Sequence, residues 1–84
     1  MQEMFIKNYI KKMTINDLRT FALKENYFLL PEEEEIIFYY IKNYWQVVLK
    51  EDPTPVFNDL KLKVRSETFN KIIQLYNHYK QYYN

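Results

Sequence analysis

The stretch LPEEEEIIFYYI at residues 30–41 decides the fold of this chain. Pro31 suits the first position of a helix, because its missing N–H group would be unpaired there in any case. The glutamates at 32–35 follow, where their negative charge meets the positive end of the helix dipole. Pro53 closes the segment soon after Lys50. We therefore predict a helix over residues 31–50, with the four glutamates in a solvent-exposed first turn.

The helix that follows the glutamates is apolar around most of its circumference. When successive residues are placed about 100° apart, the polar side chains fall in a sector about 100° wide and the apolar ones occupy the remaining ~260°. A surface helix needs an apolar stripe little wider than about 100°. This helix must therefore touch neighbours on at least two sides, either as the central helix of a bundle or as half of an interface.

The composition favours one all-α domain spanning residues 1–84. The sequence contains no glycine and no cysteine, but it has nine tyrosines, six phenylalanines and one tryptophan. Without glycine, tight β-hairpin turns and phosphate-binding loops are disfavoured. Without cysteine, disulfides and thiolate metal sites are excluded. The aromatic side chains compensate for the small size, since a domain this short hides only about 60% of its unfolded surface.

Two helices are predicted before the central one. Residues 1–12 form the first, with Met4 or Phe5, Tyr9 and Ile10 on one side. The second starts at Thr14, which has Asp17 three residues later as its capping-box partner.

Asn26 is expected to end this second helix in the left-handed conformation that glycine would otherwise take. An apolar connector at 27–30 then leads to Pro31.

The C-terminal part predicts one or two further helices. Thr54 and Pro55 restart the chain with a cap and a helix-compatible proline, and Ser66 is expected to cap the last helix. The segment LKLKVR at 60–65 also alternates as a half-buried strand would. We favour helix there, because a lone strand has nothing to pair with, although the alternation leaves a strand open. The prediction is an all-α bundle of four or five helices around a long, mostly buried central helix.

The order of these features resembles the YqfT-like proteins of Bacillus-type bacteria, a family of short chains. The likeness rests on the capped segment TINDL at 14–18, the apolar connector, the long third helix, VFND at 56–59 and Ser66 before the last helix. This family has no known function. The resemblance therefore implies the helical architecture and assigns no catalytic or binding residues.

Catalytic and metal-binding residues are scarce. Ser66 is the only serine and His78 the only histidine, and twelve residues separate them. We interpret Ser66 as a cap and His78 as a surface residue near a helix end. Glu32 and Glu35 could share a helix face, but they have no histidine beside them to complete a metal site. We therefore expect no enzyme activity, no metal and no cofactor.

The sequence also argues against a membrane segment. Its longest uncharged apolar run, at residues 36–41, is far shorter than the ~20 residues that span a bilayer. Lysines interrupt the N-terminal segment, which lacks the pattern of a signal peptide. We expect a cytoplasmic protein. Its net charge is +2 over residues 1–13, −4 over residues 14–52 and +3 over residues 53–84.

The leading hypothesis is a non-catalytic protein that acts through contacts with a protein partner or with itself, for instance as a homodimer. It rests on the wide apolar surface of the central helix and on the tyrosine-rich last helix. The candidate interface residues are Phe38, Ile41, Trp45, Leu49, Tyr76, Tyr79 and Tyr83.

The alternative hypothesis is a small nucleic-acid-binding protein. Lys61, Lys63, Arg65 and Lys71 cluster around the expected start of the last helix, where a helix-turn-helix protein would place its recognition helix. Their electrostatic footprint is modest, and the glutamates at 32–35 would repel phosphates on the same face. Nucleic acid is therefore the less favoured partner.

Overall fold

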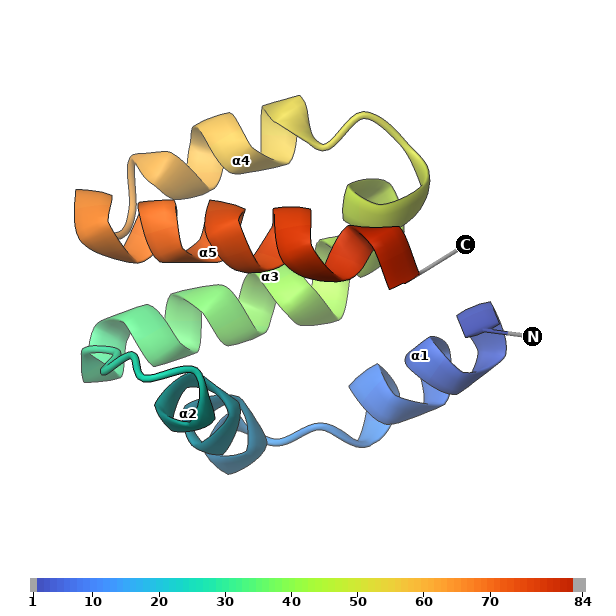
Figure 1. The fold of residues 1–84 in the computed structure, drawn as a ribbon, viewed down its shortest axis with the longest axis horizontal. Coiled ribbons are helices and arrows are strands. Elements are labelled where there is room, and N and C mark those ends of the chain that lie inside the picture. Colours follow the sequence, from blue (N-terminus) through green and yellow to red (C-terminus); the bar gives the residue numbers. More distant parts are fainter. Residues whose placement is uncertain (1, 83–84) are drawn as a thin grey trace.

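The computed structural model describes the backbone of residues 2–82 and the side chains of residues 4–81. This part of the chain consists of helices and their connections, so the all-α prediction is confirmed (Figure 1). The elements are α1 (Gln2–Lys12), α2 (Ile15–Lys24), α3 (Pro31–Lys50), α4 (Thr54–Lys61), α5 (Ser66–Tyr79) and the 3-10 turn η1 (Lys80–Tyr82). The central helix spans the residues that the sequence predicts.

Helix α3 runs through the middle of the molecule. It contacts α1, α2 and α4, and α4 in turn contacts α5. In Figure 1, α4 and α5 lie on one side of α3, while α1 and α2 lie on the other. The prediction that α3 touches neighbours on at least two sides is therefore confirmed.

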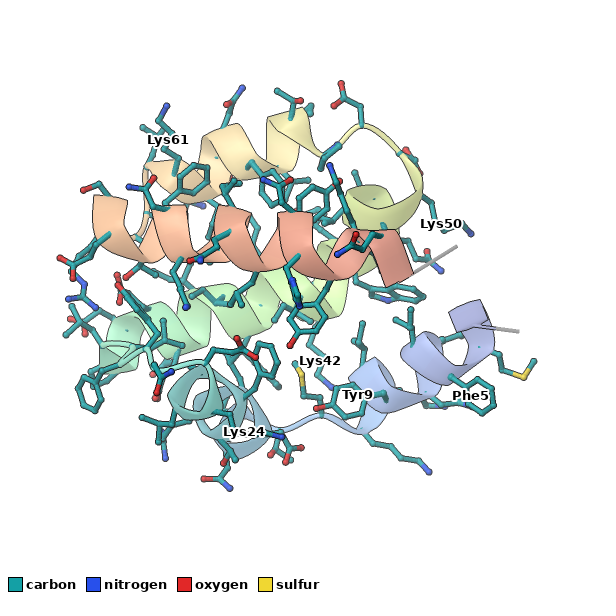
Figure 2. All side chains as sticks on the ribbon, viewed as in Figure 1. Phe5, Tyr9, Lys24, Lys42, Lys50 and Lys61 are labelled. Atoms are coloured by element: carbon teal, nitrogen blue, oxygen red, sulfur yellow. The ribbon has the colours of Figure 1, made fainter. Side chains whose placement is uncertain are left out.

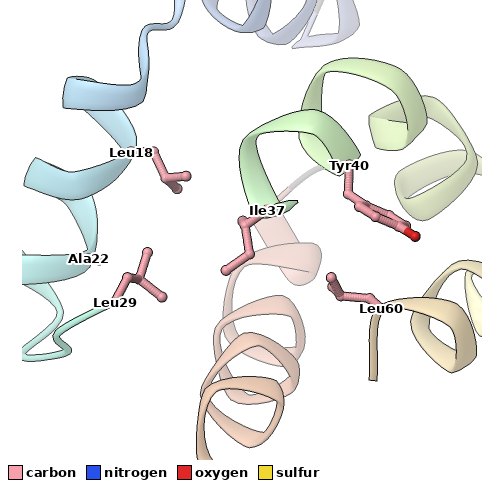
Figure 3. Close-up of a cluster of buried hydrophobic side chains, with 6 residues drawn as sticks. All are labelled: Leu18, Ala22, Leu29, Ile37, Tyr40 and Leu60. Carbon is pink, nitrogen blue, oxygen red and sulfur yellow. The ribbon is translucent and has the colours of Figure 1, made fainter. Parts of the chain in front are cut away.

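A small core joins these helices. Its buried side chains come from α2, the connector, α3 and α4 (Figure 3). They are Leu18, Ala22, Leu29, Ile37, Tyr40 and Leu60. Many other apolar side chains of α3 and α5 are only partly buried. Within residues 4–81, the apolar surface is thus covered incompletely.

Both ends of α2 follow the sequence signals. The Thr14 hydroxyl accepts a hydrogen bond from the Asp17 N–H at 3.1 Å, and the Asp17 carboxylate accepts one from the Thr14 N–H at 2.9 Å. Asn26 has a φ of 62°, the left-handed conformation expected after the helix. Both predictions are confirmed.

The segment 60–65 is neither a strand nor a continuous helix. Helix α4 ends at Lys61, and residues 62–64 turn the chain back toward α5. The capping position of α5 falls on Arg65, so Ser66 is the first helical residue and the prediction that it caps the helix is wrong. The reason lies outside the segment, because the Arg65 N–H donates to the Glu33 carboxylate at 2.9 Å.

The prediction of a fully solvated glutamate turn is also wrong. Glu33 and Glu34 are buried, with only 2% of Glu33 exposed. An arginine compensates each carboxylate: Arg19 forms two hydrogen bonds to Glu34, at 2.7 and 2.9 Å, and Arg65 pairs with Glu33. A buried carboxylate requires such partners, since an unpaired charge is costly to remove from water.

Helix α1 is held mainly from its C-terminal end. The Lys42 ammonium donates to the carbonyl oxygens of Ile10 and Lys11, at 2.5 and 3.0 Å, where the negative end of the helix dipole favours a cation. Phe5 and Tyr9 nevertheless remain exposed, by 74% and 60% respectively (Figure 2). The apolar side expected to pack inward is thus largely solvent-facing. No helix in the described part of the chain combines the length and apolarity that a bilayer span needs.

Candidate functional site

An apolar groove of about 400 Å³ lies between α2, α3, α4 and α5. Its lining residues are Leu18, Phe21 and Ala22 of α2, Tyr27 and Leu29 of the connector, Ile37, Tyr40, Ile41, Trp45, Val48 and Leu49 of α3, Val56, Phe57 and Leu60 of α4, and Thr68, Lys71, Ile72, Leu75, Tyr76 and Tyr79 of α5. Binding pockets in proteins commonly measure about 300–1,000 Å³ and have mostly hydrophobic and aromatic walls. The groove has both properties and is our candidate site.

The groove brings together most of the predicted interface residues. Ile41, Trp45 and Leu49 reach it from α3, one helical turn apart, and Tyr76 and Tyr79 reach it from α5. All five belong to the set predicted from the sequence.

Of the other two predicted interface residues, Phe38 does not line the groove. Phe38 packs against the core and lies under the Lys42 ammonium, which is 5.2 Å from the ring centroid. Tyr83 lies outside the described residues.

The side chains of the groove are covered only in part. Trp45 and Leu49 are half-buried although they face the interior of the bundle, and Tyr79 is 44% exposed at the mouth. Helix α5 contacts α4, and its side chains line the groove together with those of α3. The described residues therefore leave part of the apolar surface of α3 uncovered.

The two sides of the groove meet at one point of its mouth. The Tyr79 hydroxyl of α5 donates to the Glu25 carboxylate at the end of α2, at 2.9 Å. The rings of Tyr79 and Phe21 lie 6.0 Å apart at the same place. This contact between exposed side chains bridges the mouth and can open at little cost, because exposed polar contacts contribute little to stability.

A second apolar hollow lies beside the groove. Residues of α1, among them Phe5, Tyr9 and Ile10, form one wall of this hollow. The other wall includes Leu18 and Phe21 of α2, which also line the groove. The two hollows therefore form one continuous apolar surface that extends from α5 to α1.

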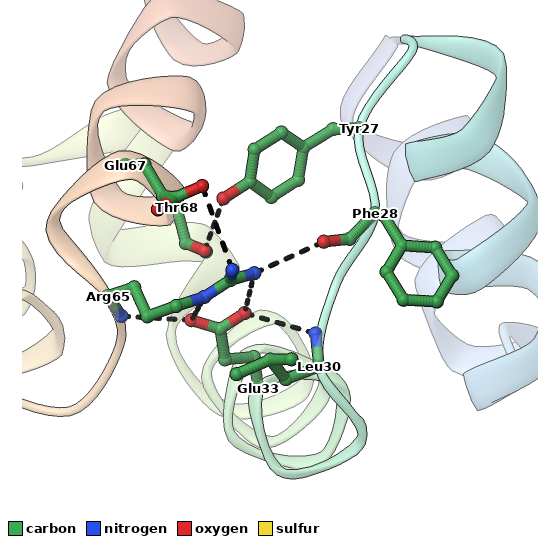
Figure 4. A network of polar contacts seen from close by, with 7 residues as sticks. All are labelled: Tyr27, Phe28, Leu30, Glu33, Arg65, Glu67 and Thr68. Carbon is green, nitrogen blue, oxygen red and sulfur yellow. Dashed lines mark hydrogen bonds and ion pairs between the residues drawn. The ribbon is translucent and has the colours of Figure 1, made fainter.

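A polar cluster closes the groove at the other end, near the start of α3 and α5 (Figure 4). Arg65 donates to Glu33 through its backbone N–H, Nε and Nη2, at 2.9, 3.1 and 2.9 Å. The Leu30 N–H donates to the same carboxylate at 3.1 Å. Thr68, which is fully buried, shares a 2.6 Å hydrogen bond with the Tyr27 hydroxyl.

This cluster fixes the charge of Glu33. Burial alone would raise the pKa of its carboxyl group. Hydrogen bonds from Arg65, Leu30 and Thr68 act in the opposite direction and outweigh burial, so that the pKa falls to about 2. Glu33 is therefore an ionised structural anchor at neutral pH and has no proton to exchange there.

The four basic residues of the nucleic-acid hypothesis lie in different settings. Arg65 is engaged by Glu33, and the Lys63 ammonium donates to the Tyr40 hydroxyl at 2.9 Å and lies 3.4 Å from the Asp59 carboxylate. Lys71 lines the apolar groove, while Lys61 is exposed (Figure 2). Two of the four basic groups are thus engaged within the chain, and a third borders the apolar groove.

The only serine and the only histidine of the sequence lie far apart. Ser66 begins α5 and His78 lies in its last turn, and twelve residues of helix separate them by about 18 Å. Within the described residues, no three histidine, aspartate or glutamate side chains are grouped as metal ligands would be.

The sequence analysis did not predict the place of two groups of residues in the site. Leu18 and Phe21 line the groove from α2, and their spacing of three residues, which is typical of one helix face, was the available signal. The sequence analysis predicts a solvated Glu33, although its place three residues after Leu30 is the position of a capping-box carboxylate. That position was the available signal.

Comparisons of the chain with protein-family models, with curated proteins and with solved structures gave no match. The resemblance to the YqfT-like family therefore stays a prediction. What the protein does has to be argued from the groove itself.

Proposed function

We propose that this chain is a non-catalytic cytoplasmic protein that acts by binding an apolar segment of a protein in its groove. The observation that carries the proposal is the convergence of Trp45, Leu49, Tyr76 and Tyr79 on one incompletely covered apolar groove. Large apolar surfaces that a small chain leaves uncovered usually mark sites of protein contact.

The extent of the apolar surface favours a protein segment over a small molecule. The groove continues past Phe21 into the second hollow, where the exposed Phe5 and Tyr9 extend it further. A small molecule would fill the groove and leave these residues in water. An amphipathic helix presents a row of side chains one turn apart and can cover such an elongated surface.

The nucleic-acid hypothesis gains no support from a specific contact. Arg65 and Lys63 already bind carboxylates of their own chain, and Lys71 lines an apolar wall. Phosphate contacts require basic groups that are available on one face.

The proposal can be tested by affinity capture from extract of the native cell with three immobilised proteins. These are the natural chain, Tyr79→Glu at the mouth of the groove, and the matched control Phe28→Glu, whose side chain is 73% exposed in the connector and does not line the groove. We expect a protein that the natural chain and Phe28→Glu retain and Tyr79→Glu does not. Equal retention by all three, or recovery of nucleic acid alone, would contradict the proposal.

A further inference from the structure

We infer that helix α1 is a hinged cover over one end of the groove, and that its displacement lengthens the apolar surface open to a partner. The inference rests on the proposed function and describes how that site is regulated. It starts from a contrast within the bundle. Each of the helices α2 to α5 has at least one buried residue, whereas α1 is the one α-helix whose described side chains include none.

The packing beneath α1 is loose. The second hollow, of about 570 Å³, separates its half-buried Ile6 and Ile10 from the opposite side. That side includes Leu18, Phe21 and Ile41, which we call the shared wall because the same residues line the groove. Well-packed interiors leave few voids larger than a water molecule. The buried core cluster contains no residue of α1, so the core can persist when α1 moves away.

The side chain of Lys42 fastens α1 at its C-terminal end. Its ammonium donates to the carbonyl oxygens of Ile10 and Lys11, at 2.5 and 3.0 Å. The same ammonium lies over the Phe38 ring of α3, 5.2 Å from the centroid. Toward the other end of the helix, Phe5 is 74% exposed. Polar attachment at one end and loose apolar packing elsewhere are typical of an element that opens locally while the rest of the chain stays folded.

The junction between α1 and α2 is suited to act as the hinge (Figure 1). Met13 and Thr14 lie between the two helices, and Met13 is buried, which holds the junction in place. Helix α2 has a cap of its own, because Thr14 and Asp17 bond each other's backbone N–H groups through their side chains. The start of α2 therefore does not depend on α1, and α2 can stay folded while α1 swings away.

The shared wall links this movement to the candidate site. With α1 in place, its side chains face the shared wall across the hollow and shorten the surface that a partner reaches. When α1 swings away, the groove continues over the shared wall, and a bound helix gains a longer track of apolar contacts. A cover of this kind lowers the apparent affinity of the groove in proportion to the fraction of molecules that are closed.

The test opens the cover in two independent ways. Ile6→Glu places a charge in the apolar hollow, where it is costly, and Lys42→Met removes the ammonium that holds the C-terminal end of α1. The matched control is Asn8→Glu, which introduces the same side chain at an exposed position of the same helix that does not line the hollow.

Amide hydrogen exchange and binding of the apolar dye anilinonaphthalene sulfonate are measured on each variant. We expect Ile6→Glu and Lys42→Met to accelerate exchange in α1 at least about tenfold, while exchange in α3 and α5 stays as slow as in the natural chain. Dye binding should rise at least about threefold in both variants, because the shared wall becomes exposed. Asn8→Glu should match the natural chain in both measurements.

Two results would overturn the inference: fast exchange in α3 and α5 of both opened variants, which would make α1 an integral part of the fold, or unchanged exchange and dye binding in both. The capture experiment separates the inference from the proposed function. If a protein retained through Tyr79 is held no more tightly by Ile6→Glu than by Asn8→Glu, the groove binds protein and only the regulatory role of α1 is wrong. If no protein is retained through Tyr79, the proposed function fails and that role fails with it.

Discussion

Glu33 and Arg65, 32 residues apart in the sequence, fasten the first turn of α3 to the first turn of α5. Three hydrogen bonds join them, and the carboxylate is buried while the guanidinium is 36% exposed. This pair sets where α5 begins and therefore how far its aromatic side stands from α3. The groove between those helices depends on it.

The first prediction concerns this pair. Glu33→Gln should lower the free energy of unfolding by about 2 kcal/mol, less than the about 3–5 kcal/mol typical of a fully buried pair, because water reaches Arg65. Urea denaturation measures the change. The matched control is Glu32→Gln, one residue earlier and exposed, which should stay within about 0.5 kcal/mol of the natural chain. Equal effects of the two substitutions would contradict the anchoring role.

The titration of the Glu33 carboxylate should also affect how stability depends on pH. The pKa of Glu33 is about 2 in the folded chain against an ordinary value of 4.5. Its contribution is therefore complete above pH 4.5 and is lost as the pH falls from 4.5 toward 2, because the unfolded chain takes up the proton first.

The loss at this one group is at most roughly 3 kcal/mol, and solvent screening at Arg65 reduces it. Glu34, whose pKa is lowered by the hydrogen bond from Arg19, acts in the same direction. Thermal melting from pH 7 to pH 2 should show a shallower decline in Glu33→Gln than in the natural chain. Parallel declines would rule out Glu33 as the titrating group.

The α2 cap, the extent of α3 and the left-handed Asn26 could be predicted because each depends on residues close in sequence. Helix capping and proline placement act over three or four positions, so their signals are visible in one chain. Part of the candidate groove could also be predicted. Trp45 and Leu49 follow helical spacing in α3, and Tyr76 and Tyr79 do so in α5.

The burial of Glu33 could not be predicted, because its partner Arg65 is distant in sequence and only the tertiary structure brings the two side chains together. The same contact explains why α5 begins one residue earlier than a cap at Ser66 would place it. The face that α1 turns outward was not predictable either. Its apolar residues are spread so widely that Ile6 and Ile10 are half-buried while Phe5 and Tyr9 stay exposed, although all four line the hollow beside α2.

The attachment of α1 should depend on Lys42. Lys42→Met removes the ammonium that binds the carbonyls of Ile10 and Lys11 and should cost about 1–2 kcal/mol of α1 docking. Amide hydrogen exchange in α1 should accelerate while exchange in α3 stays slow. The control Lys61→Met removes an exposed lysine of α4 and should leave α1 exchange unchanged.

Nucleic-acid binding should be weak and confined to low salt. Because Arg65 and Lys63 are engaged within the chain, we expect fluorescence anisotropy to detect no complex with a DNA duplex at physiological ionic strength. Lys61→Glu and Lys71→Glu should leave this result unchanged. A tight complex in the natural chain that either substitution abolishes would restore the nucleic-acid hypothesis.

The most direct test of the central claim, that a protein segment from outside the chain fills the groove, uses Trp45. It is the only tryptophan in the sequence, and it lines the groove half-buried. Acrylamide quenching of its fluorescence should be efficient in dilute protein and should fall at least severalfold in the complex with a captured partner. Efficient quenching in both states, or a tryptophan already protected in dilute protein, would contradict the account.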